Sequence, residues 1–222
     1  MIDAVLFDLD GTLADTAPDL GAALNHLRSH RGLDPVPIEV LRPHASSGAR
    51  GMIGAGLGIA PGHDEYDGLK AIFLEHYESN LLVHSRLFDG VRELLAALEA
   101  SELAWGIVTN KATRYAEPLV EGIGLRPTRG CVICGDTTPH AKPHPEPLLE
   151  AARRLDLVPA RCVYVGDDER DIVAARAAGM RSVVAGYGYL GTARGPAEWG
   201  ADAVIDHPKA LLQWLSAAIP VG

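Results

Sequence analysis

Two carboxylates separated by one residue follow an apolar run at the start of the chain. Asp8 and Asp10 come directly after residues 4–7, whose aliphatic and aromatic content is typical of a strand buried on both faces. Residues two apart in an extended chain point the same way, and Gly11 lets the backbone turn beneath them. One carboxylate can then attack an electrophile while the other carries a proton. An Asp-x-Asp-Gly segment is also a common turn, so this interpretation needs support from elsewhere in the chain.

That support comes from a second acidic cluster after another β-branched run, residues 163–166. Asp167, Asp168 and Asp171 occur there in one short segment. Carboxylates gathered at one sheet edge repel one another unless a cation lies among them. All-oxygen ligands favour Mg²⁺, which keeps several waters and accepts a phosphate oxygen. Together with a Lys142-Pro143 block, the pattern predicts a metal-assisted phosphoryl-transfer site.

The elements that must position these residues alternate between strand and helix. Strands are predicted near residues 4–7, 106–109, 130–135, 162–165, 182–185 and 203–205, and helices near residues 91–98, 114–122, 145–155, 171–178 and 211–218. Repeated strand-helix units imply a parallel sheet covered on both faces, with its chemistry at the carboxyl ends of the strands. The predicted fold class is therefore α/β with a Rossmann-like sheet.

A segment of different character interrupts this alternation. Between about Ala17 and His84 the patterns are helical and broken by prolines, and the sequence indicates no convincing strand. Turn-forming residues flank both ends, as suits a hinge. We expect a helical cap domain over residues 16–88, and a catalytic core made of residues 1–15 and 89–222.

The motifs occur in the order typical of the haloacid dehalogenase (HAD) phosphohydrolases, which the chain resembles over essentially its whole length. The resemblance implies that Asp8 is the nucleophile that forms an aspartyl-phosphate, and that Asp10 is the general acid and base. It assigns the hydroxyl of Thr109 to a phosphate oxygen. It also implies that Lys142 neutralises charge on the phosphoryl group and orients the nucleophile.

The same resemblance implies the ligands of a Mg²⁺ ion. These are Asp8, the backbone carbonyl of Asp10, and Asp167. Asp171 would position the lysine or a metal-bound water. Asp168 would either be a further metal ligand or simply end the strand.

Substrate-binding residues are expected beside the phosphate site and in the cap. Thr109 and Asn110 follow a predicted core strand, and Asn110 is expected to orient backbone. In the cap, Arg50 lies in a stretch of small residues that permits close approach, so its guanidinium would clamp a carboxylate or hydroxyls. Lys111 is expected in solvent.

Two kinds of phosphatase fit these motifs. The segment 109–111, the segment 142–145 and the helical cap most resemble phosphoglycolate phosphatases. Gly166-Asp167-Asp168 departs from their usual Gly-Asp-Ser and is similar to bacterial phosphatases of N-acetylmuramic acid 6-phosphate. Both substrates carry a carboxylate as well as a phosphate ester, so a clamp by Arg50 fits either.

Three other classes of protein compete with these phosphatases. A β-phosphoglucomutase-like isomerase uses the same nucleophile and cap, and is distinguished by sugar-phosphate interconversion without phosphate release. A haloacid dehalogenase would not need Asp10. A binding module without catalysis would be expected to lack Asp8, Asp10, Lys142 or Asp167, and all four are present.

Composition excludes several other functions. The chain has 222 residues, 47% of them hydrophobic, and a formal net charge of −9, so nucleic acids and anionic membranes are disfavoured as partners. No apolar run approaches the roughly 18 residues needed to cross a bilayer, and no targeting segment precedes the first predicted strand. We expect a cytoplasmic enzyme that acts on a small phosphate ester. Its oligomeric state is left open.

Overall fold

A six-stranded parallel sheet forms the centre of the molecule. The computed structural model describes residues 2–191 and 194–218, and the sheet order is β5-β4-β1-β6-β7-β8. The strands are β1 (Ala4–Phe7), β4 (Ala104–Val108), β5 (Val132–Ile133), β6 (Cys162–Gly166), β7 (Arg181–Ala185) and β8 (Ala203–Ile205). All neighbouring pairs are parallel. The central strand β1 is buried along its whole length, so both of its faces must be apolar.

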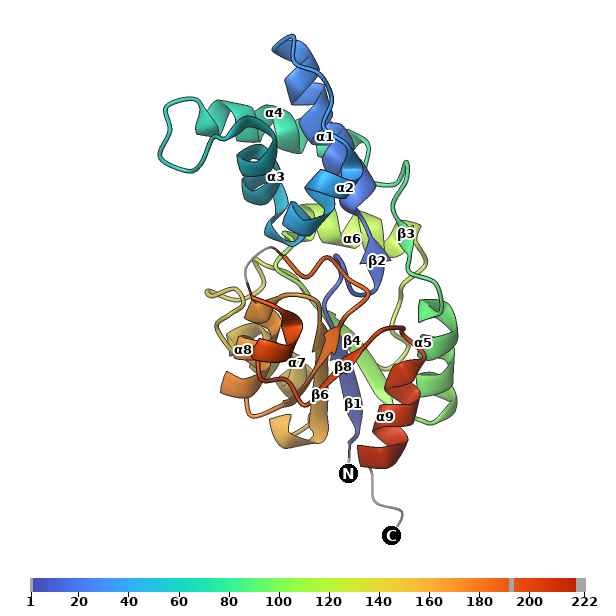
Figure 1. Ribbon diagram of the computed structural model, residues 1–222. Helices are drawn as coiled ribbons and strands as arrows, with labels where there is room; N and C mark the ends of the chain where they lie inside the picture. Colours follow the sequence, from blue (N-terminus) through green and yellow to red (C-terminus); the bar gives the residue numbers. More distant parts are fainter. Residues whose placement is uncertain (1, 192–193, 219–222) are drawn as a thin grey trace.

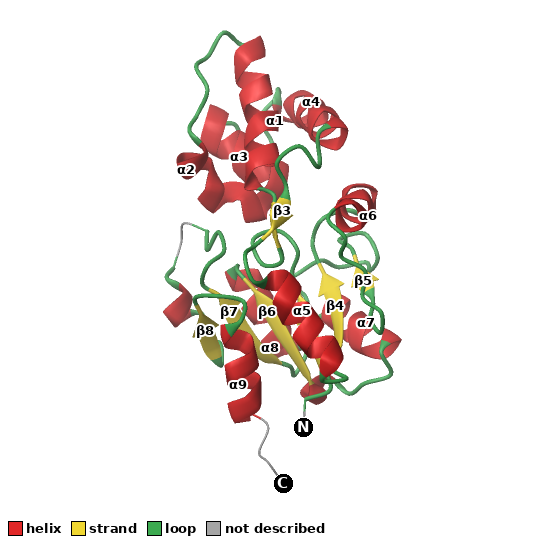
Figure 2. Ribbon diagram, turned by 90° about the vertical axis from the view of Figure 1, so that its right-hand side faces the viewer, coloured by secondary structure: helices red, strands yellow, loops and turns green. Residues whose placement is uncertain are grey.

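Helices cover both faces of this sheet, as Figures 1 and 2 show. Helices α5 (Val91–Ala100), α6 (Thr113–Gly122) and α9 (Ala210–Ala218) contribute to one apolar cluster with β1, β4, β6, β7 and β8. Helices α7 (Glu146–Arg154) and α8 (Glu169–Ala177) contribute to another cluster on the opposite face. Short 3₁₀ helices occur at Pro159–Arg161 and Pro196–Glu198. The predicted α/β architecture is confirmed.

A helical cap lies above the carboxyl ends of the strands (Figure 1). It contains α1 (Ala17–His30), α2 (Ile38–Leu41), the 3₁₀ helix Arg42–Ser47, α3 (Gly48–Leu57) and α4 (Tyr66–Ser79). These helices share an apolar cluster that includes Leu24, Met52 and Phe73, and Tyr115 and Tyr189 of the core also belong to it. The predicted helical cap is confirmed.

The chain passes between core and cap through a short ribbon that the sequence did not indicate. Strand β2 (Ala14–Asp15) pairs antiparallel with β3 (Arg86–Leu87). Two-residue strands carry too little periodicity to be recognised from sequence. The ribbon lies beside the domain limits expected from the sequence, namely a core of 1–15 and 89–222 and a cap of 16–88, and these limits stay a proposal.

The sheet also separates two of the three cysteines. Cys131 packs with the α7–α8 cluster, and Cys134 packs with the cluster on the opposite face. Burial raises the pKa of Cys131 to about 11 and also raises the pKa of Cys134, so both thiols stay protonated near neutral pH. In the described part of the chain, no helix is long and apolar enough to span a membrane.

Candidate active site

The carboxylate of Asp8 lies at the end of β1 in contact with a buried lysine. Lys142 Nζ is 2.8 Å from Asp8 Oδ1 and 2.8 Å from Asp171 Oδ1. The same ammonium group donates to the carbonyl of Val108 at 2.9 Å and lies 2.6 Å from the hydroxyl of Tyr164. Its side chain is only 3% exposed, so these partners replace water around the charge.

The pKa shifts of Asp8, Asp167 and Lys142 indicate too little positive charge around the carboxylates. Burial raises the pKa of Asp8 to about 6, although Lys142 opposes the shift. Burial, followed by repulsion from Asp8 and Asp171, holds the pKa of Asp167 well above its ordinary value. Burial disfavours the ammonium of Lys142, but Asp171 and Asp8 outweigh it and raise the pKa. One lysine therefore does not balance the carboxylates that surround it.

Asp167 follows β6 and lies in a close-fitting cradle. Its carboxylate accepts hydrogen bonds from Thr12 Oγ1 at 3.3 Å, Ser46 Oγ at 3.1 Å and the amide of Tyr189 at 2.9 Å. A Cβ at Gly11 would lie 2.2 Å from Asp167 Oδ2, and the φ of Gly11 is +88°. Glycine is required there both for space and for backbone conformation.

Three carboxylates at this sheet edge are close enough to hold one metal ion. One ligand oxygen from each of Asp8, Asp167 and Asp171 lies within 4.8 Å of the others, and these three residues are called the acidic group below. Hard oxygen donors of this kind suit a divalent cation such as Mg²⁺. Such a cation would relieve the repulsion that raises the pKa values of Asp8 and Asp167.

Asp10 has partners of its own, away from this acidic group. Thr16 Oγ1 donates to Asp10 Oδ1 at 2.5 Å, and Lys111 Nζ lies 2.9 and 3.2 Å from the two carboxylate oxygens. The ammonium of Lys111 also lies 4.9 Å from the ring centre of Tyr77, which belongs to cap helix α4. The two carboxylates of the Asp-x-Asp pair are therefore held by different lysines.

The expectation that Lys111 is solvated was wrong. Its side chain is 8% exposed, because the cap covers the loop after β4. Burial disfavours the charge, but Asp10 and Tyr77 raise its pKa above the ordinary value. The hydroxyl of Tyr77 is itself buried and has no hydrogen-bond partner among the described residues.

Thr109 and Asn110 form the loop after β4. Thr109 is buried, and its Oγ1 accepts the amide of Lys111 at 3.2 Å. The side-chain amide of Asn110 donates to the carbonyl of Lys142 at 2.8 Å and accepts the amide of Lys142 at 2.9 Å. Asn110 thereby orients the backbone that carries the buried lysine.

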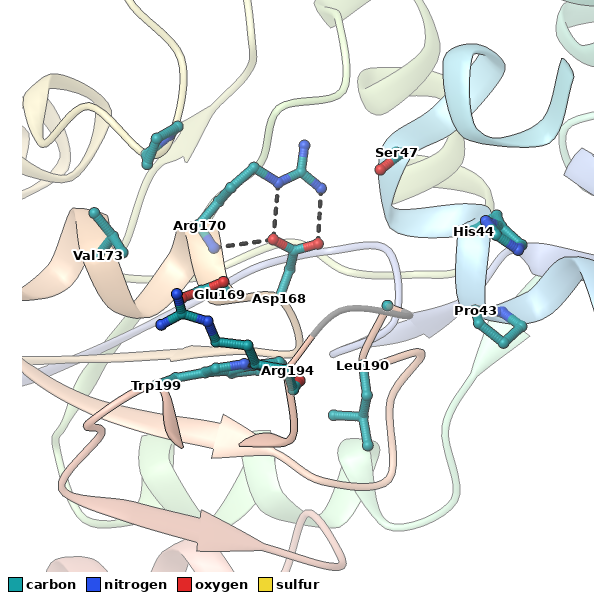
Figure 3. Close-up of a pocket in the computed structure, with 12 residues that line it drawn as sticks. Pro43, His44, Ser47, Asp168, Glu169, Arg170, Val173, Leu190, Arg194 and Trp199 are labelled. Carbon is teal, nitrogen blue, oxygen red and sulfur yellow. Dashed lines mark hydrogen bonds and ion pairs between the residues drawn. The ribbon is translucent and has the colours of Figure 1, made fainter. Parts of the chain in front are cut away.

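Asp168 caps the start of α8 and lies beside the acidic group. Its carboxylate accepts the amide of Arg170 at 2.9 Å, and the guanidinium binds its two oxygens at 2.8 and 2.9 Å (Figure 3). Arg170 also donates to the carbonyl of Ser46 in the cap at 2.9 Å. Burial opposes ionisation of Asp168, but Arg170 outweighs it and lowers the pKa. The geometry thus supports a helix-capping and cap-contacting role for Asp168.

Next to this ion pair is a side cavity of about 400 Å³, shown in Figure 3. His44 and Ser47 line it from the cap, and Arg194 and Trp199 line it from the core. Arg170 lines this cavity as well as the larger one described next. The guanidinium therefore lies at the contact between cap and core.

A larger cavity of about 830 Å³ lies between cap and core and joins the predicted residues. Its lining includes Asp8, Asp10, Thr109, Asn110, Lys142, Asp168 and Asp171 from the core and Arg50, Lys70 and Tyr77 from the cap. Arg50 belongs to α3 and is exposed. The structure therefore brings these predicted residues to one cavity. Asp167 does not line it, but it accepts a hydrogen bond from Ser46, which does.

The sequence interpretation did not assign the contacts that several residues make with this site. These residues are Ser46, Tyr77, Arg170 and Tyr189, together with Lys111 in its buried position. Tyr189 has the most partners among them, because its hydroxyl accepts the amides of Thr16 and Ala17 at 2.7 and 2.9 Å. An aromatic residue soon after a predicted strand is not distinctive enough to indicate such a contact.

The chain is similar in sequence and in structure to known proteins. The family model of haloacid dehalogenase-like hydrolases matches residues 5–185. An N-acetylmuramic acid 6-phosphate phosphatase from Pseudomonas putida is 44% identical over 97% of both chains. A phosphoglycolate phosphatase from Xanthomonas campestris is 46% identical over 98% of this chain and 97% of its own.

A solved structure gives the same result for the fold. The crystal structure of a predicted phosphoglycolate phosphatase from Haemophilus somnus is similar with a TM-score of 0.83 and 28% identity, covering 96% of this chain and 98% of that one. The phosphatase class expected from the sequence is confirmed by these relatives. From its motifs, its fold and these similarities, the chain belongs to the haloacid dehalogenase-like hydrolases.

Proposed function

We propose that the chain hydrolyses a small phosphate monoester in two steps, with Asp8 as nucleophile and Mg²⁺ as cofactor. The observation that supports this most directly is the separation of the two carboxylates. Asp8 contacts Lys142 beside the acidic group, while Asp10 contacts Lys111 and Thr16. Two carboxylates in different environments can act as nucleophile and as acid-base catalyst in one reaction.

The proposed reaction balances with these two groups and water. In the first step an oxygen of Asp8 bonds to phosphorus, the ester bond breaks, and protonated Asp10 gives its proton to the leaving alcohol oxygen. In the second step Asp10 takes a proton from a water molecule whose oxygen attacks the aspartyl-phosphate. The bond between Asp8 and phosphorus then breaks, and inorganic phosphate is released.

The phosphate itself would be held by groups at the ends of β1 and β4. The ammonium of Lys142 is the buried cation beside Asp8, so it offsets the repulsion between an anionic nucleophile and an anionic ester. The hydroxyl of Thr109 borders the same cavity and is assigned to a phosphate oxygen. Asn110 fixes the backbone of Lys142, and this fixed backbone helps to set the position of the ammonium.

The metal site is proposed at the acidic group. Asp8, Asp167 and the backbone carbonyl of Asp10 would hold Mg²⁺, which when bound supplies positive charge to the phosphate oxygens. The cradle around Asp167, with no room for a side chain at Gly11, fits a fixed ligand. Asp171 is already paired with Lys142, so its proposed role is to position that lysine.

The two candidate substrates differ in how far their carboxylate lies from the ester. Phosphoglycolate has a single carbon between the ester oxygen and the carboxylate. Lys111 contacts Asp10, the group proposed to protonate that ester oxygen, so Lys111 is close enough to bind such a carboxylate. Phosphoglycolate is therefore the proposed substrate that the core residues favour.

N-acetylmuramic acid 6-phosphate is the second candidate, supported by the Pseudomonas putida relative and by the cavity. Its lactyl carboxylate lies across a sugar ring from the phosphate. A cavity of about 830 Å³ has room for a sugar, and Arg50 offers a cation on its cap side. Arg50 is accordingly proposed to bind the remote carboxylate of this substrate.

The experiment that tests the proposal measures inorganic phosphate released from a panel of esters, with Mg²⁺ and with a chelator. The panel contains phosphoglycolate, N-acetylmuramic acid 6-phosphate, hexose 6-phosphates and β-glucose 1-phosphate. Mg²⁺-dependent release with strong preference for one carboxylated ester is expected. Conversion of glucose 1-phosphate to the 6-phosphate without release would overturn hydrolysis in favour of an isomerase. A cytoplasmic location and the absence of nucleic-acid partners stay predictions.

A further inference from the structure

We propose that His140, His144 and Glu146 form a second metal site, for a transition ion such as Zn²⁺, on the loop that carries Lys142. One ligand atom from each of the three residues lies within 4.8 Å of the others. Glu146 Oε2 is 2.6 Å from His140 Nδ1 and 3.9 Å from His144 Nδ1. The two imidazole rings are stacked with centres 4.3 Å apart.

The donor set separates this site from the acidic group at Asp8 and Asp167. Two imidazole nitrogens and one carboxylate oxygen are ligands that Zn²⁺, Co²⁺ and Ni²⁺ prefer, whereas Mg²⁺ prefers oxygen ligands and water. Three protein ligands leave a fourth position of a tetrahedral ion open to solvent. His140 and His144 are both exposed, so an ion can reach them directly.

The observed distances need little adjustment to hold an ion. Donors that each lie about 2.0–2.2 Å from Zn²⁺ in a tetrahedron are roughly 3.3–3.6 Å apart. The pair His140–Glu146 is closer than this, and the pair His144–Glu146 is more distant. Both histidine side chains are largely exposed, so they can rotate to bring their donors to one ion. Binding through His144 Nδ1 would replace the hydrogen bond that this atom accepts from the amide of Glu146.

The loop is already restricted, which lowers the entropy cost of binding. Prolines at positions 139, 143, 145 and 147 restrict the backbone of this loop. One of them directly precedes each of the three ligands. The amide of His144 donates to the carbonyl of Ala141 at 3.0 Å, and Thr138 Oγ1 donates to the carbonyl of His140 at 2.8 Å. Glu146 is the first residue of α7, which gives the third ligand a helical support.

The location gives the ion a structural role. Lys142 lies midway between the two histidines, and its ammonium points inward to Asp8 while the histidines face solvent. An ion bound by His140 and His144 would link the two ends of this segment without touching the ammonium. We therefore expect the ion to hold this loop in place. It should also stabilise the folded protein, because unfolding would separate the three ligands.

The test measures Zn²⁺ binding to the full-length, metal-stripped protein by competition with a chromophoric chelator. All measurements use an Asp167→Asn variant as the background protein, with Mg²⁺ present, so that Zn²⁺ binding at the acidic group is reduced. One Zn²⁺ per chain is expected, and its affinity should fall roughly tenfold or more in His140→Ala and in His144→Ala. Co²⁺ in place of Zn²⁺ should give the visible absorption of a tetrahedral site, and each histidine variant should lose it.

His63 provides a matched control. Its Nδ1 accepts the amide of Glu65 at 3.2 Å, as His144 Nδ1 accepts the amide of Glu146 at 3.2 Å. His63→Ala should leave Zn²⁺ binding unchanged, and circular dichroism checks that all variants fold. Absence of Zn²⁺ binding in the background protein, or a Zn²⁺ affinity in both histidine variants equal to that of the background protein, would overturn the proposal.

Discussion

The ammonium of Lys111 lies 2.9 Å from the carboxylate of Asp10, beneath the ring of a cap residue, Tyr77. The contact between Lys111 and Tyr77 joins a core loop to the cap, next to the carboxylate proposed to protonate the leaving alcohol. The Tyr77 hydroxyl is buried nearby, with no hydrogen-bond partner in the described part of the chain. A buried hydroxyl without a partner is costly, so a substrate group that bonds to it gains affinity.

Lys111→Gln should discriminate between esters with and without a carboxylate next to the ester oxygen. We expect kcat/KM for phosphoglycolate to fall roughly 10–100-fold, the cost of losing a charged hydrogen bond. The value for 2-hydroxyethyl phosphate, which lacks the carboxylate, should change much less. Steady-state kinetics on both esters measures the difference, and Lys111→Arg should retain more activity than Lys111→Gln. Equal losses on both esters would instead mean that Lys111 acts only through Asp10.

Arg50→Gln tests whether Arg50 binds the lactyl carboxylate of N-acetylmuramic acid 6-phosphate. If N-acetylmuramic acid 6-phosphate is the substrate, its KM should rise roughly tenfold or more, while N-acetylglucosamine 6-phosphate, which lacks the lactyl group, should be little affected. Arg31→Gln is the control, because Arg31 pairs with Glu65 on the cap surface. An unchanged KM for the lactyl-bearing ester would remove Arg50 from substrate recognition.

Asp8→Asn should abolish turnover and leave the fold intact. The amide keeps the shape of the side chain but is not a nucleophile, so kcat should fall by at least about 10³-fold. Phosphate release together with circular dichroism measures both parts. Asp10→Asn should slow hydrolysis of an alkyl ester more than that of an activated aryl ester, whose leaving group needs no proton. Wild-type rates in Asp8→Asn would contradict the assigned nucleophile.

Metal-free protein should lose stability as the pH rises. The pKa of Asp167 is raised by burial and by repulsion from Asp8 and Asp171, so the folded state holds the proton more tightly than the unfolded chain. The free energy of unfolding therefore falls as the pH rises from the ordinary value of 3.8 through the folded-state pKa. Mg²⁺ should restore this stability in the wild type.

Asp167→Asn isolates that contribution. The metal-free variant should melt above metal-free wild type at pH 8, by about 2–4 °C for each kcal/mol gained, and the difference should shrink toward pH 4. Thermal denaturation with and without Mg²⁺ measures both effects, and exposed Asp34→Asn is the control. A variant that melts below wild type at pH 8 would show that the hydrogen bonds to Asp167 outweigh the repulsion.

Two substitutions at Asp168 separate its helix cap from its ion pair. Asp168→Ser keeps an oxygen that caps α8 but loses the pairing with Arg170, whereas Asp168→Ala loses both. Asp168→Ala should be less stable than Asp168→Ser by about 1 kcal/mol. Urea denaturation measures the order, and equal stabilities would mean that the oxygen contributes nothing to the helix.

The convergence of the acidic residues was predictable because it depends only on strand ends. Parallel strands bring their carboxyl ends to one edge, and apolar runs before Asp8, Thr109 and Asp167 located three of those ends. Periodicity indicated that the cap is helical, but no local pattern shows which cap residue faces the core. The contact of Tyr77 with Lys111 and that of Ser46 with Asp167 depend on how the cap is seated.

Tyr189 links the acidic group to the start of the cap. Its amide donates to Asp167, and its hydroxyl accepts the amides of Thr16 and Ala17 and donates to Asp15. The first turn of α1 is thus completed by a side chain from the core. If this cap were transplanted onto the core of a relative, it would lose this partner unless the segment around residue 189 moved with it. For engineering, the exchangeable unit of this protein is the cap together with that segment.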